Sequence, residues 1–275
     1  MRNLVVAGGV QLGRRCFGTP LRSMAVAMER LILAETFEAI VRSVTNLDEL
    51  VNALGECSRA MGFRYFALAH HVDFGTDGGR GVRLHNYPKS WEAWFDERSL
   101  GRFDPVHRAS HVANNGFLWS RVPKMIQLTN GDRDVFLEAR RVGIGDGLTV
   151  PAHVPGEYNG SCSFAVGAHE FLPREQVMVA QLVGGIAFEA ARRIALPRRL
   201  PRPVLPLTDR QRDCVLWAAR GKTDWEISRI LGVSHETVIQ HLKHARERYG
   251  VTKRAHLAVM ALFDGSICFS DIFIR

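Results

Sequence analysis

The sequence predicts a two-domain protein: an α+β domain built as a helix–sheet–helix sandwich, followed by a small all-α domain. Three observations lead to this fold class. The chain has 275 residues, which is nearer two domains than one. Helical periodicity and short β-rich runs alternate through residues 24–196. A proline-rich segment then precedes a final stretch in which only helix signals occur.

The first domain contains five helical and four strand-like segments. Apolar residues recur with helical spacing at about 25–44, 48–61, 88–97, 132–142 and 173–195, while alternating or β-rich runs occupy Tyr65–Val72, Gly81–Asn86, Gly147–Val154 and Cys162–Val166. These strands are expected to form a sheet largely from consecutive hairpin-like pairs. Helices before and after them would cover its faces, which gives the sandwich.

Composition and proline content set the boundaries. Residues 197–206 contain four prolines, which exclude helix and ladder pairing and predict an interdomain linker. The domains are therefore placed at 24–196 and 207–275. Residues 1–23 form a basic leader that we expect to be disordered or to precede the true start, because Gly8 and Gly9 interrupt its apolar run before a signal-like core develops.

The charge is distributed unevenly between these segments. The net charge of +8 divides into +4 for residues 1–23, −2 for 24–196 and +6 for 197–275. A weakly acidic body joined to a basic C-terminal domain predicts that the second domain binds a polyanion, with nucleic acid as the leading candidate. The sequence contains no run of about 18 apolar residues, so it predicts no membrane span. The odd number of cysteines, five, is typical of the reducing cytoplasm.

The C-terminal domain carries helix signals in close succession. Thr208 with Gln211, and Thr223 with Glu226, are capping-box pairs that start helices near 209 and 224. Gly232 ends the second helix, and Ser234 caps a third. This third helix places Val238, Leu242, Ala245 and Tyr249 on one apolar stripe. The pattern predicts a helix-turn-helix whose outward polar face enters the major groove of DNA.

The segments 207–212, 219–234 and 237–242 resemble the LuxR-type helix-turn-helix along about 60 residues. The resemblance implies that Glu226 is a structural acid and that Thr237–Lys243 read DNA. Arg220, Arg248 and Arg254 would add phosphate contacts. The main expected DNA-binding residues are Lys222, Thr223, Glu236, Thr237, Ile239, Gln240, Lys243, Arg246 and Lys253.

The body resembles the autoinducer-binding domain of the quorum-sensing LuxR regulators over roughly residues 30–195. The similarity lies in the segments 86–91, 103–106, 117–119, 145–153 and 159–163. It implies an acyl-homoserine lactone ligand whose amide N–H is accepted by Asp104. Tyr87 and Trp91 would donate to the amide and lactone carbonyls, Ser163 would bond the same region, and Trp119 would wall the lactone ring. The expected ligand-binding residues are Tyr87, Trp91, Phe95, Asp104, Val106, Trp119 and Ser163.

Independently of the resemblance, Tyr87, Trp91 and Phe95 recur every four residues. This spacing predicts one helical face that presents a phenol, an indole N–H and an apolar ring to one cavity.

The sequence contains no enzyme motif of the hydrolase, nucleotide-binding or metalloprotease type, and no paired cysteines to hold zinc. We therefore expect neither an enzyme nor a metal or cofactor. The expected function is a cytoplasmic transcriptional regulator that controls promoters in a quorum-sensing response. It would act as a homodimer on a palindromic double-stranded DNA site, with RNA polymerase as a further partner. Two alternatives stay open: a LuxR-type regulator of a different small molecule, and a non-quorum regulator that shares only the DNA module.

Overall fold

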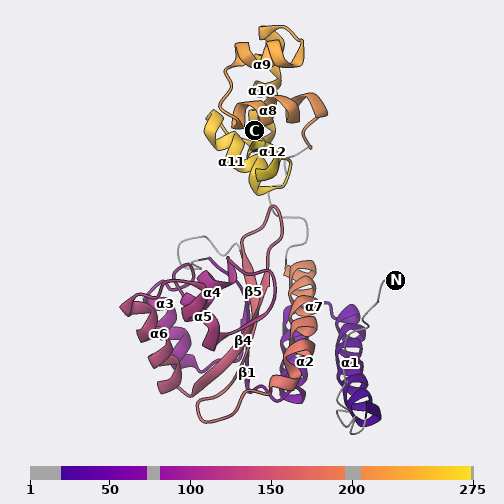
Figure 1. Cartoon of the computed structure of the whole chain (residues 1–275), viewed down its shortest axis with the longest axis vertical. Helices are drawn as coiled ribbons and strands as arrows, with labels where there is room; N and C mark the ends of the chain where they lie inside the picture. Colours follow the sequence, from indigo (N-terminus) through magenta and orange to yellow (C-terminus); the bar gives the residue numbers. More distant parts are fainter. Residues whose placement is uncertain (1–19, 73–80, 196–205, 274–275) are drawn as a thin grey trace, which may run out of the picture.

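The computed structural model describes residues 20–72, 81–195 and 206–273, with side chains from Met28 onward. It shows an α+β unit up to residue 195 and an all-helical unit from residue 206 (Figure 1). The predicted linker lies outside the described residues except for Pro206. Of the predicted leader, residues 1–19 also lie outside them. The last four leader residues belong to helix α1, Pro20–Ser43, so the first ordered element starts before the predicted boundary at residue 24.

Within the described residues the sheet has five strands in the order β2-β1-β5-β4-β3, and every neighbouring pair is antiparallel. Their bounds are β1 Tyr65–His70, β2 Arg83–His85, β3 Phe117–Leu118, β4 Ile144–Ala152 and β5 Gly160–Gly167. Three of the four pairings join strands consecutive in the sequence, as expected. The fourth pairs β1 with β5, which puts the last strand in the middle of the sheet.

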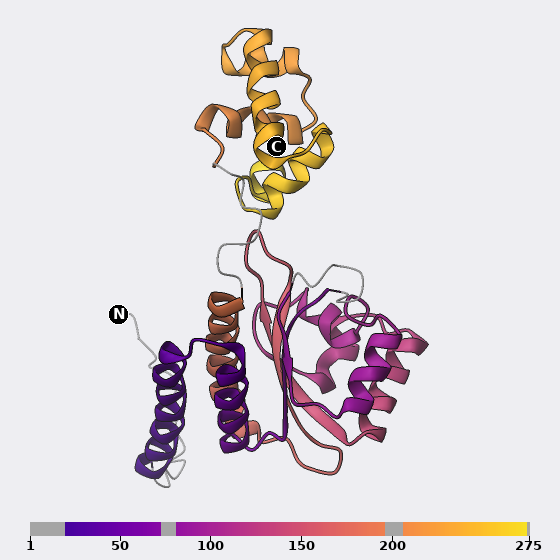
Figure 2. The same ribbon diagram turned by 180° about the vertical axis from the view of Figure 1, so that it is seen from behind.

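Helices form a layer on each face of the sheet (Figures 1 and 2). One layer contains α1, α2 and α7, and the other contains the shorter helices α3 to α6. The further bounds are α2 Leu47–Ala60, α3 Lys89–Glu97, α4 Pro105–Ser110, α5 Val122–Met125, α6 Asn130–Arg141 and α7 Val177–Ala195. This arrangement confirms the predicted sandwich.

The strand sequences explain why the two faces differ. In β1, Phe66 and Leu68 are buried in the main core beneath α2 and α7, while Ala67 and Ala69 face the other layer. In β5, all eight residues are buried, so the strand has no solvent face. Cys162 and Phe164 join the main core, whereas Ser163 lies on the opposite face because successive side chains alternate.

Several short elements were absent from the prediction. Helices α4 and α5, strand β3 and the 3-10 helix η1, Trp119–Arg121, span only two to six residues each, too few to show periodicity. The 3-10 helix η2, Arg174–Gln176, occupies the start of the helix predicted at 173. Helix α6 begins at Asn130, two residues early, because Thr129 and Asp132 form a reciprocal capping box.

The C-terminal unit has the predicted helix-turn-helix and two further helices. The bounds are α8 Asp209–Ala219, α9 Asp224–Leu231, α10 His235–Tyr249, α11 Arg254–Phe263 and α12 Phe269–Phe273. Both predicted capping boxes are present, and Gly232 ends α9 in the left-handed conformation. Val238, Leu242 and Ala245 of α10 are buried against the neighbouring helices. No helix among the described residues is long and apolar enough to cross a membrane.

Two adjacent glycines of α7 provide a test of the layer contact. A Cβ on Gly184 would lie 2.9 Å from a methyl carbon of Val150 and 3.4 Å from Cys162, whereas a Cβ on Gly185 meets nothing within 4 Å. Gly185→Ala is expected to raise the free energy of unfolding by about 1 kcal/mol, the helix-propensity gain. Gly184→Ala is expected to lower it by about 1 kcal/mol, because overpacking exceeds that gain. Urea unfolding of the two variants should give opposite signs; equal effects would contradict this close contact.

Candidate functional site

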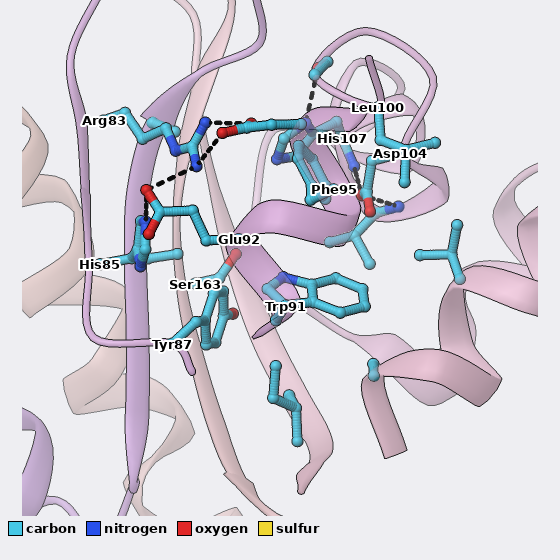
Figure 3. Close-up of a pocket in the computed structure, with 18 of the residues that line it drawn as sticks. Arg83, His85, Tyr87, Trp91, Glu92, Phe95, Leu100, Asp104, His107 and Ser163 are labelled. Atoms are coloured by element: carbon cyan, nitrogen blue, oxygen red, sulfur yellow. Dashed lines mark hydrogen bonds and ion pairs between the residues drawn. The ribbon is translucent and has the colours of Figure 1, made fainter. Parts of the chain in front are cut away.

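A cavity lies between the sheet and the layer of short helices. It is lined by β1, β2, α3, the start of α4, η1, α6, the first residue of β4 and the middle of β5. All seven ligand-binding residues expected from the sequence line this one cavity: Tyr87, Trp91, Phe95, Asp104, Val106, Trp119 and Ser163. Figure 3 shows several of these side chains converging from separate elements.

Helix α3 supplies the aromatic wall of the cavity. Trp91 and Phe95 lie one turn apart on it, with ring centroids 5.9 Å apart, and Trp91 is buried. The expectation that Tyr87 shares this helical face is wrong, because α3 begins at Lys89 after Pro88. Proline disfavours a helical conformation for the residue before it, so Tyr87 lies in the connection that leads into α3. Its ring still reaches the cavity.

Asp104 is both a helix cap and a cavity residue. Its Oδ1 accepts N–H bonds from Val106 at 2.8 Å and His107 at 2.9 Å at the start of α4. The second carboxylate oxygen, Oδ2, takes no part in this cap. Burial, and secondly the charge of Asp104, raise the pKa of Tyr87 well above its ordinary value. The phenol therefore stays protonated and can donate a hydrogen bond, while the buried carboxylate beside it can accept one.

A chain of hydrogen bonds positions Ser163. The Trp119 indole N–H donates to Thr149 Oγ at 2.8 Å, and Thr149 Oγ lies 2.8 Å from Ser163 Oγ. Because Thr149 accepts from Trp119, its own hydroxyl proton can be donated to Ser163. Ser163 then has its proton available for a carbonyl in the cavity. Thr149 was missed from sequence, since its partner is a strand neighbour and its register could not be known in advance.

The edge of the cavity formed by β2 and α3 is ionic. Arg83 binds Asp96 at 2.5 Å and Glu92 at 3.1 Å, and Glu92 lies 3.5 Å from His85 Nε2 (Figure 3). His85 Nδ1 is buried and has no hydrogen-bond partner among the described atoms. These lining residues were also missed, because charged side chains near a strand and a helix are most often simply solvated.

Histidines from the end of β1 and from α4 gather beside the cavity. The His71 ring stacks on His107 at a centroid distance of 3.9 Å, and its Nδ1 lies 2.9 Å from His111 Nε2. Its Nε2 lies 2.9 Å from Ser161 Oγ. Burial, and then the neighbouring histidines, hold the pKa of His71 well below its ordinary value. In the part of the chain that the structure describes, no group of His, Cys, Asp or Glu is arranged to hold a metal ion.

The expected DNA-reading side chains lie on the outer face of α10. Glu236, Gln240 and Lys243 are exposed, and Gln240 Nε2 donates to Glu236 Oε1 at 3.1 Å. Thr237 and Ile239 are half-buried beside them. Glu226 has its pKa lowered to about 2, chiefly by the backbone N–H of Thr223 and its hydroxyl. That geometry fits the structural role expected for this acid.

Three arginines that we expect from the sequence to contact DNA phosphates instead bind groups within the C-terminal unit. Arg220 donates to the carbonyl of Asp271, Arg248 to that of Pro206, and Arg254 binds Asp224. Their guanidinium groups hold α8, α10 and α11 to neighbouring segments. The other cations expected at the DNA are Lys222, Lys243, Arg246 and Lys253, of which Lys243 and Lys253 are exposed. Lys222 is paired with Glu226 at 3.1 Å.

A pocket lined by polar and aromatic side chains in an α+β domain, followed by a helix-turn-helix with an exposed polar face, defines a ligand-responsive DNA-binding regulator. Family comparison agrees. Residues 46–191 match the autoinducer binding domain, and residues 205–261 match the bacterial regulatory proteins of the luxR family. The chain belongs to the LuxR-type quorum-sensing transcriptional regulators, and it is not an enzyme.

Individual relatives align over most of their length. The transcriptional activator AhyR of Aeromonas hydrophila is 30% identical over 77% of this chain and 83% of its own. VanR of Vibrio anguillarum is 29% identical over 82% of this chain and 94% of its own. Among solved structures, Escherichia coli SdiA superimposes with a TM-score of 0.63 at 19% identity, covering 89% of this chain and 99% of SdiA. SdiA supports the fold.

The histidine cluster predicts that acid destabilises the ligand-binding domain. His71 and His111 have pKa values below the ordinary value of 6.5 in the folded state, chiefly because of burial. Below pH 6.5 the unfolded chain therefore binds more protons, and stability falls as the pH decreases. Melting at pH 5.5 and pH 7.5 should show this loss. His111→Asn should reduce it, whereas His256→Asn, an exposed control in α11, should not. Equal pH dependence in all three proteins would contradict the prediction.

Proposed function

We propose that the ligand of this regulator is an acyl-homoserine lactone and that the cavity binds its head group through Asp104, Tyr87, Trp91 and Ser163. The observation that supports this most is the convergence of one buried carboxylate with hydroxyl and indole donors on a single cavity. The ligand amide has one N–H and one carbonyl, and the lactone has a second carbonyl. Asp104 Oδ2 accepts the N–H, Tyr87 and Ser163 donate to the amide region, and Trp91 donates to the lactone.

Physical chemistry favours this pairing over simple core packing. A buried polar group left without a partner costs about 1–3 kcal/mol, so a binding site must match each ligand donor and acceptor. Trp119, whose indole N–H donates to Thr149, lies beside the lactone ring. The small side chains of Ala67 and Ala69 leave room for the acyl chain along the sheet. Val106 and Phe95 complete an apolar lining.

The alternative ligand class is a different lipid-like molecule. SdiA, which shares the fold, has been solved in complex with octanoyl-rac-glycerol. That molecule has no amide N–H, so a requirement for Asp104 as an acceptor of N–H distinguishes the two classes. Melting the protein with acyl-homoserine lactones of short to long chain, and with octanoyl glycerol, tests the proposal. A lactone present at a thousandfold excess over its dissociation constant should raise the free energy of unfolding by about 4 kcal/mol. No shift with any lactone would refute it.

The DNA-bound form is proposed to be a cytoplasmic homodimer on a palindromic promoter site, from which contact with RNA polymerase is made. Exposed apolar side chains on two neighbouring helices support dimer formation. They are Met28, Leu31 and Ile32 of α1 and Met178 and Leu182 of α7. In a monomer these apolar side chains stay in contact with water, whereas a second copy of the chain would bury them. The two helix-turn-helix units of a dimer would then present Glu236, Thr237, Ile239, Gln240 and Lys243 to two half-sites.

Asp104→Asn tests the head-group assignment. Asparagine is also a good helix cap, so α4 and the melting temperature without ligand should change little. The variant loses the charge on the acceptor, and affinity for the best lactone should fall at least tenfold, about 1.4 kcal/mol. Asp134→Asn, exposed on α6 and away from the cavity, is the matched charge control. Unchanged affinity by calorimetry would remove Asp104 from the site.

Trp91→Phe separates a hydrogen-bond donor from packing. Phenylalanine retains most of the ring but deletes the indole N–H. Lactone affinity is expected to fall. A purely packing role predicts instead that the variant lowers stability without ligand and leaves affinity unchanged, which melts and calorimetry on the same variant distinguish.

Gln240→Ala and Lys253→Ala test the DNA surface. Gln240→Ala should cost about 1–3 kcal/mol on the preferred site and relax base preference, because the amide can pair with a base edge. Lys253→Ala should weaken all sequences alike and flatten the salt dependence, as loss of a phosphate contact does. Binding-site selection and salt titration measure both. If base preference in Gln240→Ala stayed unchanged at every position, this reading face would be wrongly placed.

A further inference from the structure

The connection between β4 and β5 contacts the C-terminal unit. The backbone N–H of Gly156 donates to the carbonyl of Phe263, the last residue of α11. The Tyr158 ring lies beside the Phe263 ring at a centroid distance of 6.4 Å. The tip of this hairpin reaches the C-terminal unit in both views (Figures 1 and 2). A carbonyl at the end of a helix lacks a partner within the helix, so the hairpin supplies one.

Two glycines allow the backbones to approach. A Cβ on Gly265 would lie 3.2 Å from Pro155 Cβ, and one on Gly156 would lie 3.7 Å from Asp264 Cβ. Both glycines have positive φ, 77° and 81° respectively. The contact therefore joins short segments of 155–158 and 263–265. It is small, so its occupancy is easily shifted by a change at either side.

The residue between these contacts faces the ligand-binding domain instead. Glu157 is nine-tenths buried and accepts two hydrogen bonds from Arg192 of α7, at 2.6 and 2.5 Å. Its Oε2 lies 3.8 Å from His70 Nε2. His70 ends β1 and is among the residues that line the ligand cavity, while its ring lies on the opposite face of the strand, 5.2 Å from the ring of Phe188 in α7. The hairpin tip is thus anchored to the cavity wall on one side and to the DNA-binding unit on the other.

We propose that residues 155–158 form the docking surface for the chain's own DNA-binding domain and that Glu157, through His70 and Arg192, transmits occupancy of the cavity to this contact. The transmission rests on the proposed ligand function. A bound ligand fixes the wall that carries His70, which fixes Glu157 and holds the hairpin in its docking position. Docking uses the end of α11 and leaves the outer face of α10 exposed, so the docked form remains able to bind DNA.

Disulfide trapping tests the docking surface without ligand. In the double variant Pro155→Cys, Gly265→Cys the two Cβ atoms would lie 3.2 Å apart. This is within a few tenths of an ångström of the Cβ–Cβ distance found in disulfides. The background carries Cys16→Ser and Cys268→Ser, since Cys268 is exposed whereas Cys57, Cys162 and Cys214 are buried. Mild oxidation of the full chain should give an intramolecular disulfide, detected on non-reducing gels and by mass spectrometry.

The matched control pairs Pro155→Cys with Gly232→Cys. Gly232 is also a positive-φ glycine of the DNA-binding unit, but its Cβ would meet nothing within 4 Å. A second pair, Gly156→Cys with Asp264→Cys, tests the same contact should Gly265→Cys impair folding. Cross-linking at least tenfold faster in either docking pair than in the control supports the surface. Equal rates would overturn it.

Glu157→Gln tests the transmission. The lactone with the largest melting shift should accelerate cross-linking of the docking pair at least threefold. Glu157→Gln should abolish this acceleration while retaining the melting shift, because Glu157 does not line the cavity. Glu189→Gln removes the other, mostly exposed carboxylate partner of Arg192 and should keep the acceleration.

The outcomes of this experiment separate the two proposals. A melting shift without acceleration, or equal behaviour of the two variants, would overturn transmission alone. No melting shift with any lactone would refute the proposed function and, with it, the transmission, while cross-linking without ligand would still decide the docking surface.

Discussion

The structure depends on one constraint, the burial of β5 on both of its faces. Every residue of this strand is buried, so successive side chains pack alternately against two different layers of helices. Cys162, Phe164 and Val166 belong to the main core with α2 and α7, and Ser161 and Ser163 face the layer of short helices. Because side chains alternate along a strand, a shift of register by one residue would place hydroxyls in the main core. The same register brings Thr149 opposite Ser163, and so builds the hydrogen-bond chain from Trp119.

The second layer is polar where the first is apolar, and this asymmetry makes the cavity useful for sensing. The main core is filled by the chain's own apolar residues, such as Phe37, Phe63 and Phe164. The opposite face holds Asp104, Tyr87 and His85 Nδ1, which has no partner among the described residues; burial of such groups is costly until something pairs with them. A ligand that pairs with the head-group residues stabilises the folded domain, so sensing and stability are linked.

Much of this could be predicted from local patterns. The periodic segments predicted the long helices and the sandwich, and capping residues such as Thr208 and Thr223 set helix starts to within a residue. Elements of two to six residues were missed because so short a segment shows no period. Similarity to the family brought together residues far apart in sequence, and all of them line one cavity. Tyr87 was misplaced on a helix because its spacing was used without the effect of Pro88.

What local patterns could not provide is the set of contacts that arise from register and domain arrangement. Nothing in the sequence near Arg220 or Arg254 shows that their charges are used within the domain, since the partner carbonyls and carboxylates lie 30 to 51 residues away. The stacking of His71 on His107 likewise depends on how β1 faces α4.

Glu157 shows most clearly why such contacts matter for function. Its neighbours on either side, Gly156 and Tyr158, contact α11, while its own carboxylate points back to Arg192 and His70. A ligand can shift a conformational equilibrium only by the difference in its affinity for the two states. A small contact needs only a small difference in affinity, so a hairpin tip a few residues long is a physically sufficient link between the cavity and the helix-turn-helix unit.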